Sequence, residues 1–180
     1  MSDLKFPIYL DHHATTPIDP RVLEEMLPYF VEKFGNASSL DHSYGYEASV
    51  AVESAREKIA NVIGARHDEI IFTSGATESN NLALIGTMEK YKYRGDHLIT
   101  CVTEHKAILD TARHLESLGK KVTYLPVNEY GEINLEQLVQ SITDKTVMIS
   151  IMTANNEIGT IADVTEIGKI AHEKKCDFSY

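Results

Sequence analysis

The sequence has little cysteine, no long apolar run and no basic stretch. Its two cysteines, Cys101 and Cys176, lie far apart and form neither a CxxC pair nor a disulfide framework. No stretch of 18 apolar residues is present, so we expect no transmembrane helix. The start, MSDLKFPIYL, lacks the charged-then-apolar build of a signal peptide. A reducing cytoplasm is therefore the expected compartment.

Charge and histidine spacing argue against nucleic-acid binding, membrane binding and a metal site. The chain carries 17 basic and 27 acidic residues, a net charge of −10, and this excess of acidic residues is typical of a protein that is kept soluble by its charge. Without a basic patch, neither nucleic acid nor an anionic membrane is an expected partner. His12 and His13 are adjacent and would point to opposite faces of a strand, and no HxH or HxxxH pattern occurs near His105. No metal site is expected.

The first third of the chain predicts helices after an extended start. One helix has Asp19 as its N-cap and Gly35 as its stop. A second is expected from about residue 46 to 63, with Gly64 ending it. Residues 1–65 are therefore expected to form an N-terminal extended segment with helices.

Beyond residue 66, short β-branched runs alternate with amphipathic helical patterns. The expected strands are EIIFT, HLITCV, KVTYLPV and TVMISIMT. The expected helices are residues 77–93, 106–118, 134–142 and 163–175. This alternation predicts an α/β fold with a parallel, doubly wound sheet flanked by helices over residues 66–180. The last helix should lead into another strand, but the chain there reads CDFSY. Nothing in that stretch is expected to cover the exposed edge of the sheet.

Polar stretches follow three of these strands, where an open α/β sheet binds its ligands. In SGATE, Gly75 allows close backbone approach, and the first helical amides at Ala76 and Thr77 suit a phosphate group. Ser74 and Thr77 add hydroxyl donors. An ordinary N-cap made by Ser74 or Thr77 is equally consistent with this pattern. The stretch contains neither GxxxxGK nor GxGxxG.

The other two stretches are TEHKA and TANNEIGT. A single histidine at a strand end is more often a surface or core residue, but the imidazole of His105 could also stack on an aromatic cofactor or move a proton near neutral pH. Asn155 and Asn156 offer amides that can donate to a phenolate or carboxylate, although asparagine also suits turns.

Five blocks of sequence, taken in order, resemble a known family. They are YLDHHATTP, GNASSLDHSYGYEA, EIIFTSGATESNNLAL, TEHKAIL and TANNEIGT. Together they resemble the NifS/IscS-type cysteine desulfurases, which are pyridoxal-phosphate enzymes of the class V aminotransferase group, from about residue 8 to 175. The resemblance implies the fold type I of pyridoxal-phosphate-dependent transferases, here the N-terminal part of the large domain and incomplete.

The resemblance also implies roles for individual residues. Ala76 and Thr77 would bind the phosphate of pyridoxal 5′-phosphate, His105 would stack on its ring and act in proton transfer, and Asn156 would contact its phenolic oxygen. The implied reaction removes sulfur from L-cysteine, leaving L-alanine and an enzyme persulfide. That sulfur would go to iron–sulfur cluster or thio-cofactor assembly, through a sulfur acceptor or scaffold protein. A homodimer is implied for the full-length enzyme.

Family members are much longer, and the resemblance implies what is missing. The aspartate that pairs with the pyridine nitrogen, the Schiff-base lysine and the persulfide cysteine belong to the absent part; Lys106, Cys101 and Cys176 do not match them. Residues 66–180 are thus expected to be a partial cofactor-binding domain from an interrupted frame or a fragment, inactive and aggregation-prone alone. The alternatives are a selenocysteine lyase or another class V enzyme, and a non-catalytic remnant or interaction fragment.

Overall fold

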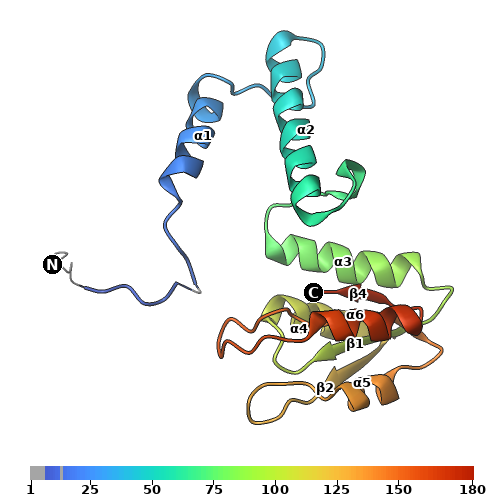
Figure 1. Cartoon of the computed structure of the whole chain (residues 1–180). Coiled ribbons are helices and arrows are strands. Elements are labelled where there is room, and N and C mark those ends of the chain that lie inside the picture. The colour runs from blue at the N-terminus through green and yellow to red at the C-terminus, as the bar shows by residue number, and fades with distance from the viewer. Residues whose placement is uncertain (1–6, 13) are drawn as a thin grey trace. The chain divides into compact units, whose positions relative to one another are not determined.

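The computed structural model describes residues 7–12 and 14–180, so His13 lies outside the described residues. The chain forms two compact units, which we call the N-terminal unit (Met1–Phe72) and the C-terminal unit (Thr73–Tyr180). The N-terminal unit contains α1 (Pro20–Val31), α2 (Ser43–Ile63) and the 3₁₀ turn η1 (His67–Glu69) (Figure 1). None of the helices in the described part of the chain is both long and apolar enough to cross a membrane.

Local signals set the ends of the two N-terminal helices. The Asp19 carboxylate accepts the Arg21 N–H at 2.9 Å, which confirms the predicted N-cap of α1. This helix ends at Val31, before the predicted stop at Gly35, and two successive amides close its last turn on the carbonyl of Pro28. Helix α2 ends as predicted at Gly64, whose φ of 70° is the left-handed conformation that glycine favours.

The C-terminal unit alternates helices and strands. Its elements are α3 (Ala76–Lys90), β1 (His97–Cys101), α4 (Lys106–Ser117), β2 (Lys121–Leu125), α5 (Leu135–Ser141), β3 (Thr146–Ser150), α6 (Val164–Glu173) and β4 (Asp177–Ser179). The strands form one sheet in the order β2-β1-β3-β4, and every pair is parallel. This confirms the predicted parallel α/β architecture.

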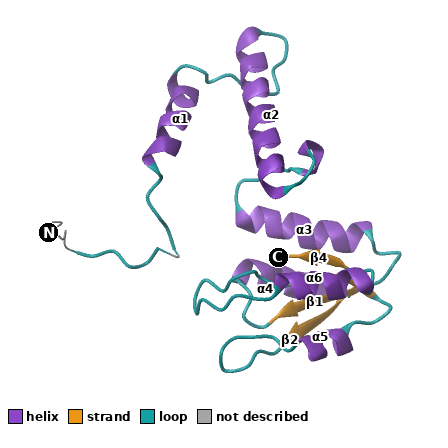
Figure 2. Cartoon of the chain, in the orientation of Figure 1, coloured by secondary structure: helices purple, strands orange, loops and turns teal. Residues whose placement is uncertain are grey.

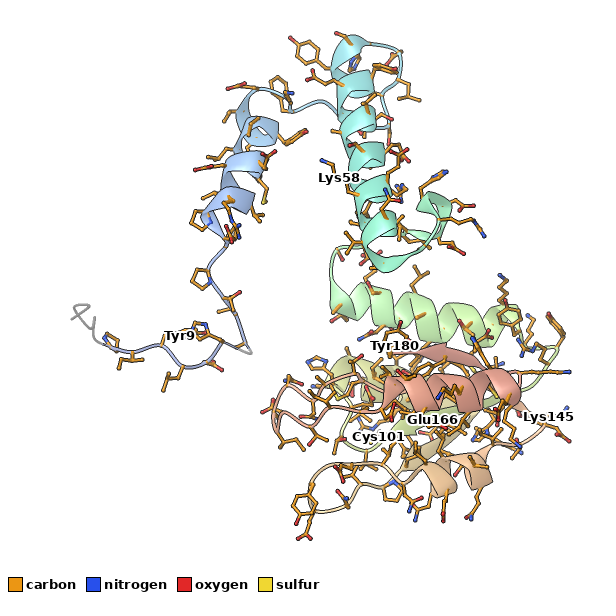
Figure 3. The ribbon with its side chains drawn as sticks, in the orientation of Figure 1. Tyr9, Lys58, Cys101, Lys145, Glu166 and Tyr180 are labelled. Atoms are coloured by element: carbon orange, nitrogen blue, oxygen red, sulfur yellow. The ribbon has the colours of Figure 1, made fainter. Side chains whose placement is uncertain are left out.

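Helices cover both faces of the sheet (Figure 2). On one face, α3 and α4 pack in an apolar cluster that includes Leu84, Leu98 and Leu115. On the other face, α5 and α6 pack in a second cluster that includes Leu138, Ile149 and Ile167. Strands β1 and β3 are buried along their whole length, as expected for parallel strands covered by helices on both faces. Figure 3 shows Cys101, the last residue of β1, within this packed interior.

Two expectations about strands are wrong. The predicted strand EIIFT, residues 69–73, does not form: Glu69 ends η1, residues 70–73 pair with no strand among the described residues, and Ile71 and Phe72 are exposed. A β-branched run supplies strand propensity, but a strand also needs a partner to complete its hydrogen-bond ladder. Conversely, the polar stretch CDFSY contains a strand, because Asp177–Ser179 pairs in parallel with β3. Backbone pairing, rather than apolar composition, makes β4.

Candidate functional site

The carboxyl ends of β1 and β3 lie side by side where the chain reverses its direction through the sheet. From β1 the chain passes by α4 to β2 on one side, and it returns by α5 to β3 on the other side. Because α4 and α5 cover opposite faces, a crevice forms between the loops that follow β1 and β3. In Figure 1 this edge is the left side of the sheet, where α3 also begins.

The start of α3 differs from every other α-helix start in the described residues. Its N-cap is Gly75, and no side chain accepts a hydrogen bond from its first turn. Each of the other five α-helices has a side-chain cap; the capping residues are Asp19, His42, His105, Asn134 and Asp163. The first-turn amides of Ala76 and Thr77 are therefore available to an acceptor from outside the helix.

Open space and one hydroxyl accompany these amides. A Cβ placed on Gly75 would meet no atom within 4 Å, and the φ of 157° there is one that other residues rarely adopt. The Ser74 hydroxyl and amide instead donate to the Glu78 carboxylate at 2.6 and 2.7 Å, and these bonds lower the pKa of Glu78. Ser74 is thus not the free hydroxyl donor that the sequence suggested, whereas the exposed Thr77 hydroxyl has no partner among the described residues.

His105 is exposed and caps α4. Its Nδ1 accepts the Ala107 N–H at 3.1 Å, which leaves Nε2 as the nitrogen that carries the proton in the neutral ring. The sequence left open whether this histidine belongs to the core, and the structure places it at the surface. Helices α3 and α4 pack on one face of the sheet, and the Thr111 hydroxyl donates to the Asn81 side chain at 2.9 Å between them. Both helix starts therefore lie at the carboxyl edge.

The two asparagines after β3 have different tasks. Asn155 organises its loop: its Nδ2 donates to the Thr103 carbonyl at 2.9 Å, and its Oδ1 accepts the amides of Glu157 and Ile158. Asn156 is exposed, and its amide makes one 3.3 Å bond, to the neighbouring Glu157. The Asn155–Thr103 bond brings the loop with Asn156 to the loop with His105.

Glu104 is a residue whose placement sequence reasoning missed. It is 7% exposed, and its Oε1 accepts the Met152 N–H at 2.6 Å. Burial raises the pKa of this carboxyl to about 7. It lines a cavity of about 230 Å³ at the switch point, together with Cys101, Thr103 and Asn155. A glutamate in the stretch TEHKA looks like a surface residue, and only its position directly after a buried strand hints otherwise.

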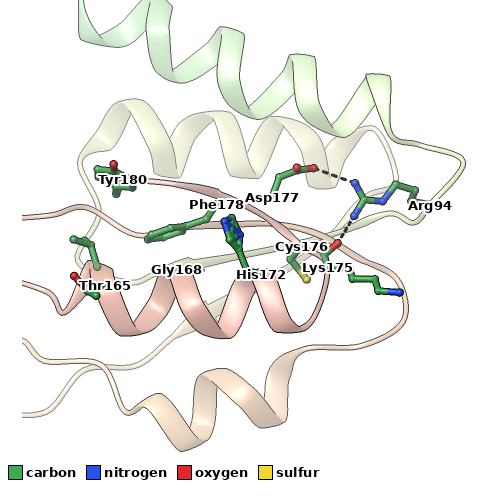
Figure 4. Close-up of a pocket in the computed structure, with 10 residues that line it drawn as sticks. Arg94, Thr165, Gly168, His172, Lys175, Cys176, Asp177, Phe178 and Tyr180 are labelled. Atoms are coloured by element: carbon green, nitrogen blue, oxygen red, sulfur yellow. Dashed lines mark hydrogen bonds and ion pairs between the residues drawn. The ribbon is translucent and has the colours of Figure 1, made fainter. Parts of the chain in front are cut away.

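A larger hollow, of about 710 Å³, lies elsewhere and contains none of the predicted site residues (Figure 4). It borders β4 and α6, and Arg94 reaches across it to the Asp177 carboxylate at 3.3 Å and to the Lys175 carbonyl. Burial raises the pKa of the Cys176 thiol in its wall. Within residues 7–12 and 14–180, no three His, Cys, Asp or Glu side chains gather as metal ligands.

Comparison with known proteins now decides the family. The profile of the family described as Aminotransferase class-V matches residues 8–179, nearly the whole chain. The chain belongs to the class-V aminotransferase family. Its curated relatives include the cysteine desulfurases IscS of Rickettsia bellii and Rickettsia rickettsii, which are 58% and 56% identical over 174 residues. Both alignments cover 97% of this chain and 42% of the relative, so this class-V chain spans less than half of their length.

Solved structures of related proteins agree with this family assignment. A NifS-like protein superposes with a TM-score of 0.91 at 44% identity, over 96% of this chain and 48% of that protein. A cysteine desulfurase of Thermococcus onnurineus superposes with a TM-score of 0.85 at 29% identity, over 95% and 42%. Because the Rickettsia relatives and the Thermococcus structure are named as cysteine desulfurases, the alternative of another class V enzyme or a selenocysteine lyase is not favoured.

Class-V aminotransferases of this kind depend on pyridoxal 5′-phosphate, and the residues present here fit that group. An uncapped helix start with open space at Gly75 suits a phosphate. At the same edge of the sheet, His105 presents an exposed imidazole and Asn156 an exposed amide, which suit an aromatic ring and its phenolic oxygen.

Proposed function

We propose that this chain supplies cofactor-binding residues for a cysteine desulfurase. The reaction takes the sulfur of L-cysteine onto an enzyme thiol, giving L-alanine and a persulfide. The observation that carries the proposal is the uncapped start of α3 within a class-V chain, because it is the one α-helix start in the described residues that leaves its first-turn amides without a side-chain acceptor. A related structure, SspA in complex with cysteine, superposes with a TM-score of 0.89 and supports cysteine as the substrate.

Each residue would have a distinct task. The amides of Ala76 and Thr77, with the Thr77 hydroxyl, would hold the phosphate. His105 would lie against the pyridine ring and, through Nε2, hold or move a proton next to the reacting carbon. Asn156 would donate its amide to the phenolic oxygen. When bound, pyridoxal phosphate supplies an electron sink.

The proposal also includes partners and a location. A sulfur-accepting or iron–sulfur scaffold protein would take the persulfide sulfur, and a second copy would pair with the full-length enzyme. Exposed apolar side chains of the N-terminal unit, such as Val22, Phe30 and Val31, support contact with another protein surface. The cytoplasm is the proposed compartment, and the two free thiols support a reducing environment.

The phosphate seat can be tested directly with the 180-residue chain. Pyridoxine 5′-phosphate is the probe of choice, because it lacks the aldehyde that would react with surface lysines. We expect its addition to shift the amide NMR signals of Gly75, Ala76 and Thr77 first. Replacing Thr77 by Val removes the hydroxyl and keeps the shape, and this change should weaken binding about tenfold.

A matched control comes from α6. Thr165, like Thr77, is the second residue of its helix and is exposed, but α6 is already capped by Asp163. Thr165→Val should leave probe binding unchanged. Equal loss in both variants, or shifts spread over all helix starts, would show that the probe binds by charge alone and that α3 holds no phosphate seat.

A further inference from the structure

Two hydrogen bonds join the loop after β1 to the loop after β3. Glu104 Oε1 accepts the Met152 N–H at 2.6 Å, and Asn155 Nδ2 donates to the Thr103 carbonyl at 2.9 Å. The loop after β3 donates both bonds and the loop after β1 accepts both, and each loop gives one side chain and one backbone group. We call this pair the loop clamp. Because it closes across the switch point, it fixes the separation of the two loops.

The clamp lies next to the proposed cofactor contacts in the chain. Glu104 directly precedes His105, and Asn155 directly precedes Asn156. Glu104 is 7% exposed, whereas His105 and Asn156 are exposed. Each loop therefore combines a side chain tied into the protein with a neighbour that faces outward, and the tie limits where the outward neighbour can lie.

We propose that Glu104 is a positioning residue: through the loop clamp it sets the spacing between His105 and Asn156, and so the fit of an aromatic ring between them. This inference rests on the proposed function, because it assigns the ring contacts to those two residues. It goes beyond the proposed function in giving a task to a buried carboxyl that touches neither the phosphate seat nor the ring.

The surroundings of Glu104 make the clamp sensitive to pH. The cavity that it lines has two other carboxyl groups, Glu132 and Asp163, and the thiol of Cys101, and neither lysine nor arginine lines it. Burial raises the pKa of Glu104 to about 7. Since an ionised carboxylate accepts a hydrogen bond more strongly than a carboxylic acid, the bond to Met152 should tighten as pH rises through 7.

Two variants and one control test the proposal in the 180-residue chain. Glu104→Ala removes the acceptor, and Glu104→Gln keeps an acceptor but cannot ionise. The control is Glu132→Ala, since Glu132 lines the same cavity but bonds to Asn128 in its own loop. The readouts are hydrogen exchange of the Met152 amide, its NMR shift against pH, and the affinities for pyridoxine 5′-phosphate and for inorganic phosphate.

We expect Glu104→Ala to speed hydrogen exchange of the Met152 amide about tenfold and to lower the affinity for pyridoxine 5′-phosphate about tenfold. The affinity for inorganic phosphate should not change. Glu104→Gln should nearly preserve the exchange rate of the Met152 amide and the affinity for pyridoxine 5′-phosphate. It should abolish the pH dependence of the Met152 NMR shift near pH 7. Glu132→Ala should alter none of these quantities. If Glu104→Ala fails to fold, loss of the pH-dependent shift in Glu104→Gln alone still supports the clamp, and its persistence refutes it.

The outcomes separate this proposal from the proposed function. If the wild-type chain binds neither probe, the proposed function fails, while the exchange and pH data on Met152 still decide whether the clamp exists. If the wild-type chain binds both probes and Glu104→Ala binds pyridoxine 5′-phosphate as tightly as wild type, the phosphate seat stands and the positioning role of Glu104 is wrong.

Discussion

The two units follow the same sequence rules for helices but differ in what those helices bury. In the described part of the N-terminal unit, the buried residues are Gly45, Ala48 and Ala60, and α1 has none. In the C-terminal unit, every residue of β1 and β3 is buried, and two apolar clusters cover the two faces of the sheet. An amphipathic pattern thus specifies a helix in either unit, while burial also requires a second layer against which the helix can pack.

The apolar stripe of α1 illustrates the difference. Val22, Met26 and Phe30 recur every four residues, yet they are 52%, 37% and 67% exposed within this chain. Capping by Asp19 and a proline at the first helical position define this helix, and burial of its apolar face contributes little. The C-terminal unit should therefore respond strongly to truncation of apolar side chains, and the N-terminal unit weakly.

The largest expected effect tests this contrast directly. Ile149→Ala should lower the free energy of unfolding of the C-terminal unit by about 4 kcal/mol, because Ile149 is fully buried between β1, β4 and the α5–α6 layer. Phe30→Ala removes a larger side chain from α1 but should cost less than about 0.5 kcal/mol. Urea dependence of amide exchange in β1 and α1 measures each unit separately. Similar losses in both variants would contradict the contrast.

The next effect is a pH dependence that belongs to the C-terminal unit. The pKa of Glu104, about 7 against an ordinary 4.5, corresponds to about 3 kcal/mol. The folded chain keeps this proton after the unfolded chain has released it, so the contribution of Glu104 to stability is fully present below pH 4.5 and is lost as pH rises through 7. Unfolding experiments on wild type and Glu104→Gln from pH 4.5 to 8 should show a difference in stability between the two proteins that changes as pH rises through 7, because only wild type loses this contribution. An unchanged slope in the variant would assign the effect to another group.

These contrasts also show what the sequence could predict. The caps at Asp19 and Asn134 and the stop at Gly64 were predictable, because each depends on residues within one turn of chain. Pairing and burial were not, because they depend on distant segments. The run EIIFT has strand propensity without a strand partner, and the buried Glu104 finds its hydrogen-bond partner in Met152, far along the chain.

The same limit applies to the candidate site. His105 and Asn156 could be placed at the carboxyl edge from the sequence, because each follows a predicted strand that the structure contains, whereas the start of α3 was placed there through the strand EIIFT, which does not form. The sequence did not reveal that Ser74 is bound by Glu78, or that Asn155 serves the loop while Asn156 faces outward. Those distinctions come from side-chain geometry that no local pattern encodes.

A buried histidine extends the contrast with an effect of opposite pH sign. His97 in β1 binds the hydroxyls of Thr146 in β3 and Thr123 in β2, both at 2.8 Å, and so joins three strands. His97→Leu should cost about 2 kcal/mol through these lost bonds. Burial lowers the pKa of His97, so the folded chain stays neutral where the unfolded chain takes up a proton. Stability should therefore fall as pH drops below 6.5 in wild type, and less steeply in His97→Leu.

The matched control for this titration lies in the N-terminal unit, where His67 is exposed in η1. His67→Leu should leave the acid limb of the stability curve unchanged. A curve that flattened equally in both variants would mean that total histidine charge, rather than the buried position of His97, sets the response to acid.

The smallest expected effects are two glycine substitutions with opposite signs. Gly64→Ala in the N-terminal unit should destabilise by about 1 kcal/mol, because φ is 70° there and no contact within 4 Å could compensate for the strain. Gly86→Ala, on the exposed side of α3, should stabilise by about 0.5–1 kcal/mol, since alanine favours the helix and meets no obstacle. Amide exchange in α2 and α3 measures both changes. Neither substitution removes a buried side chain, so two stability changes of similar size would show that backbone preferences act equally in the two units. Packing would then be the difference between the units. A loss of stability in Gly86→Ala would instead reveal a packing constraint on α3.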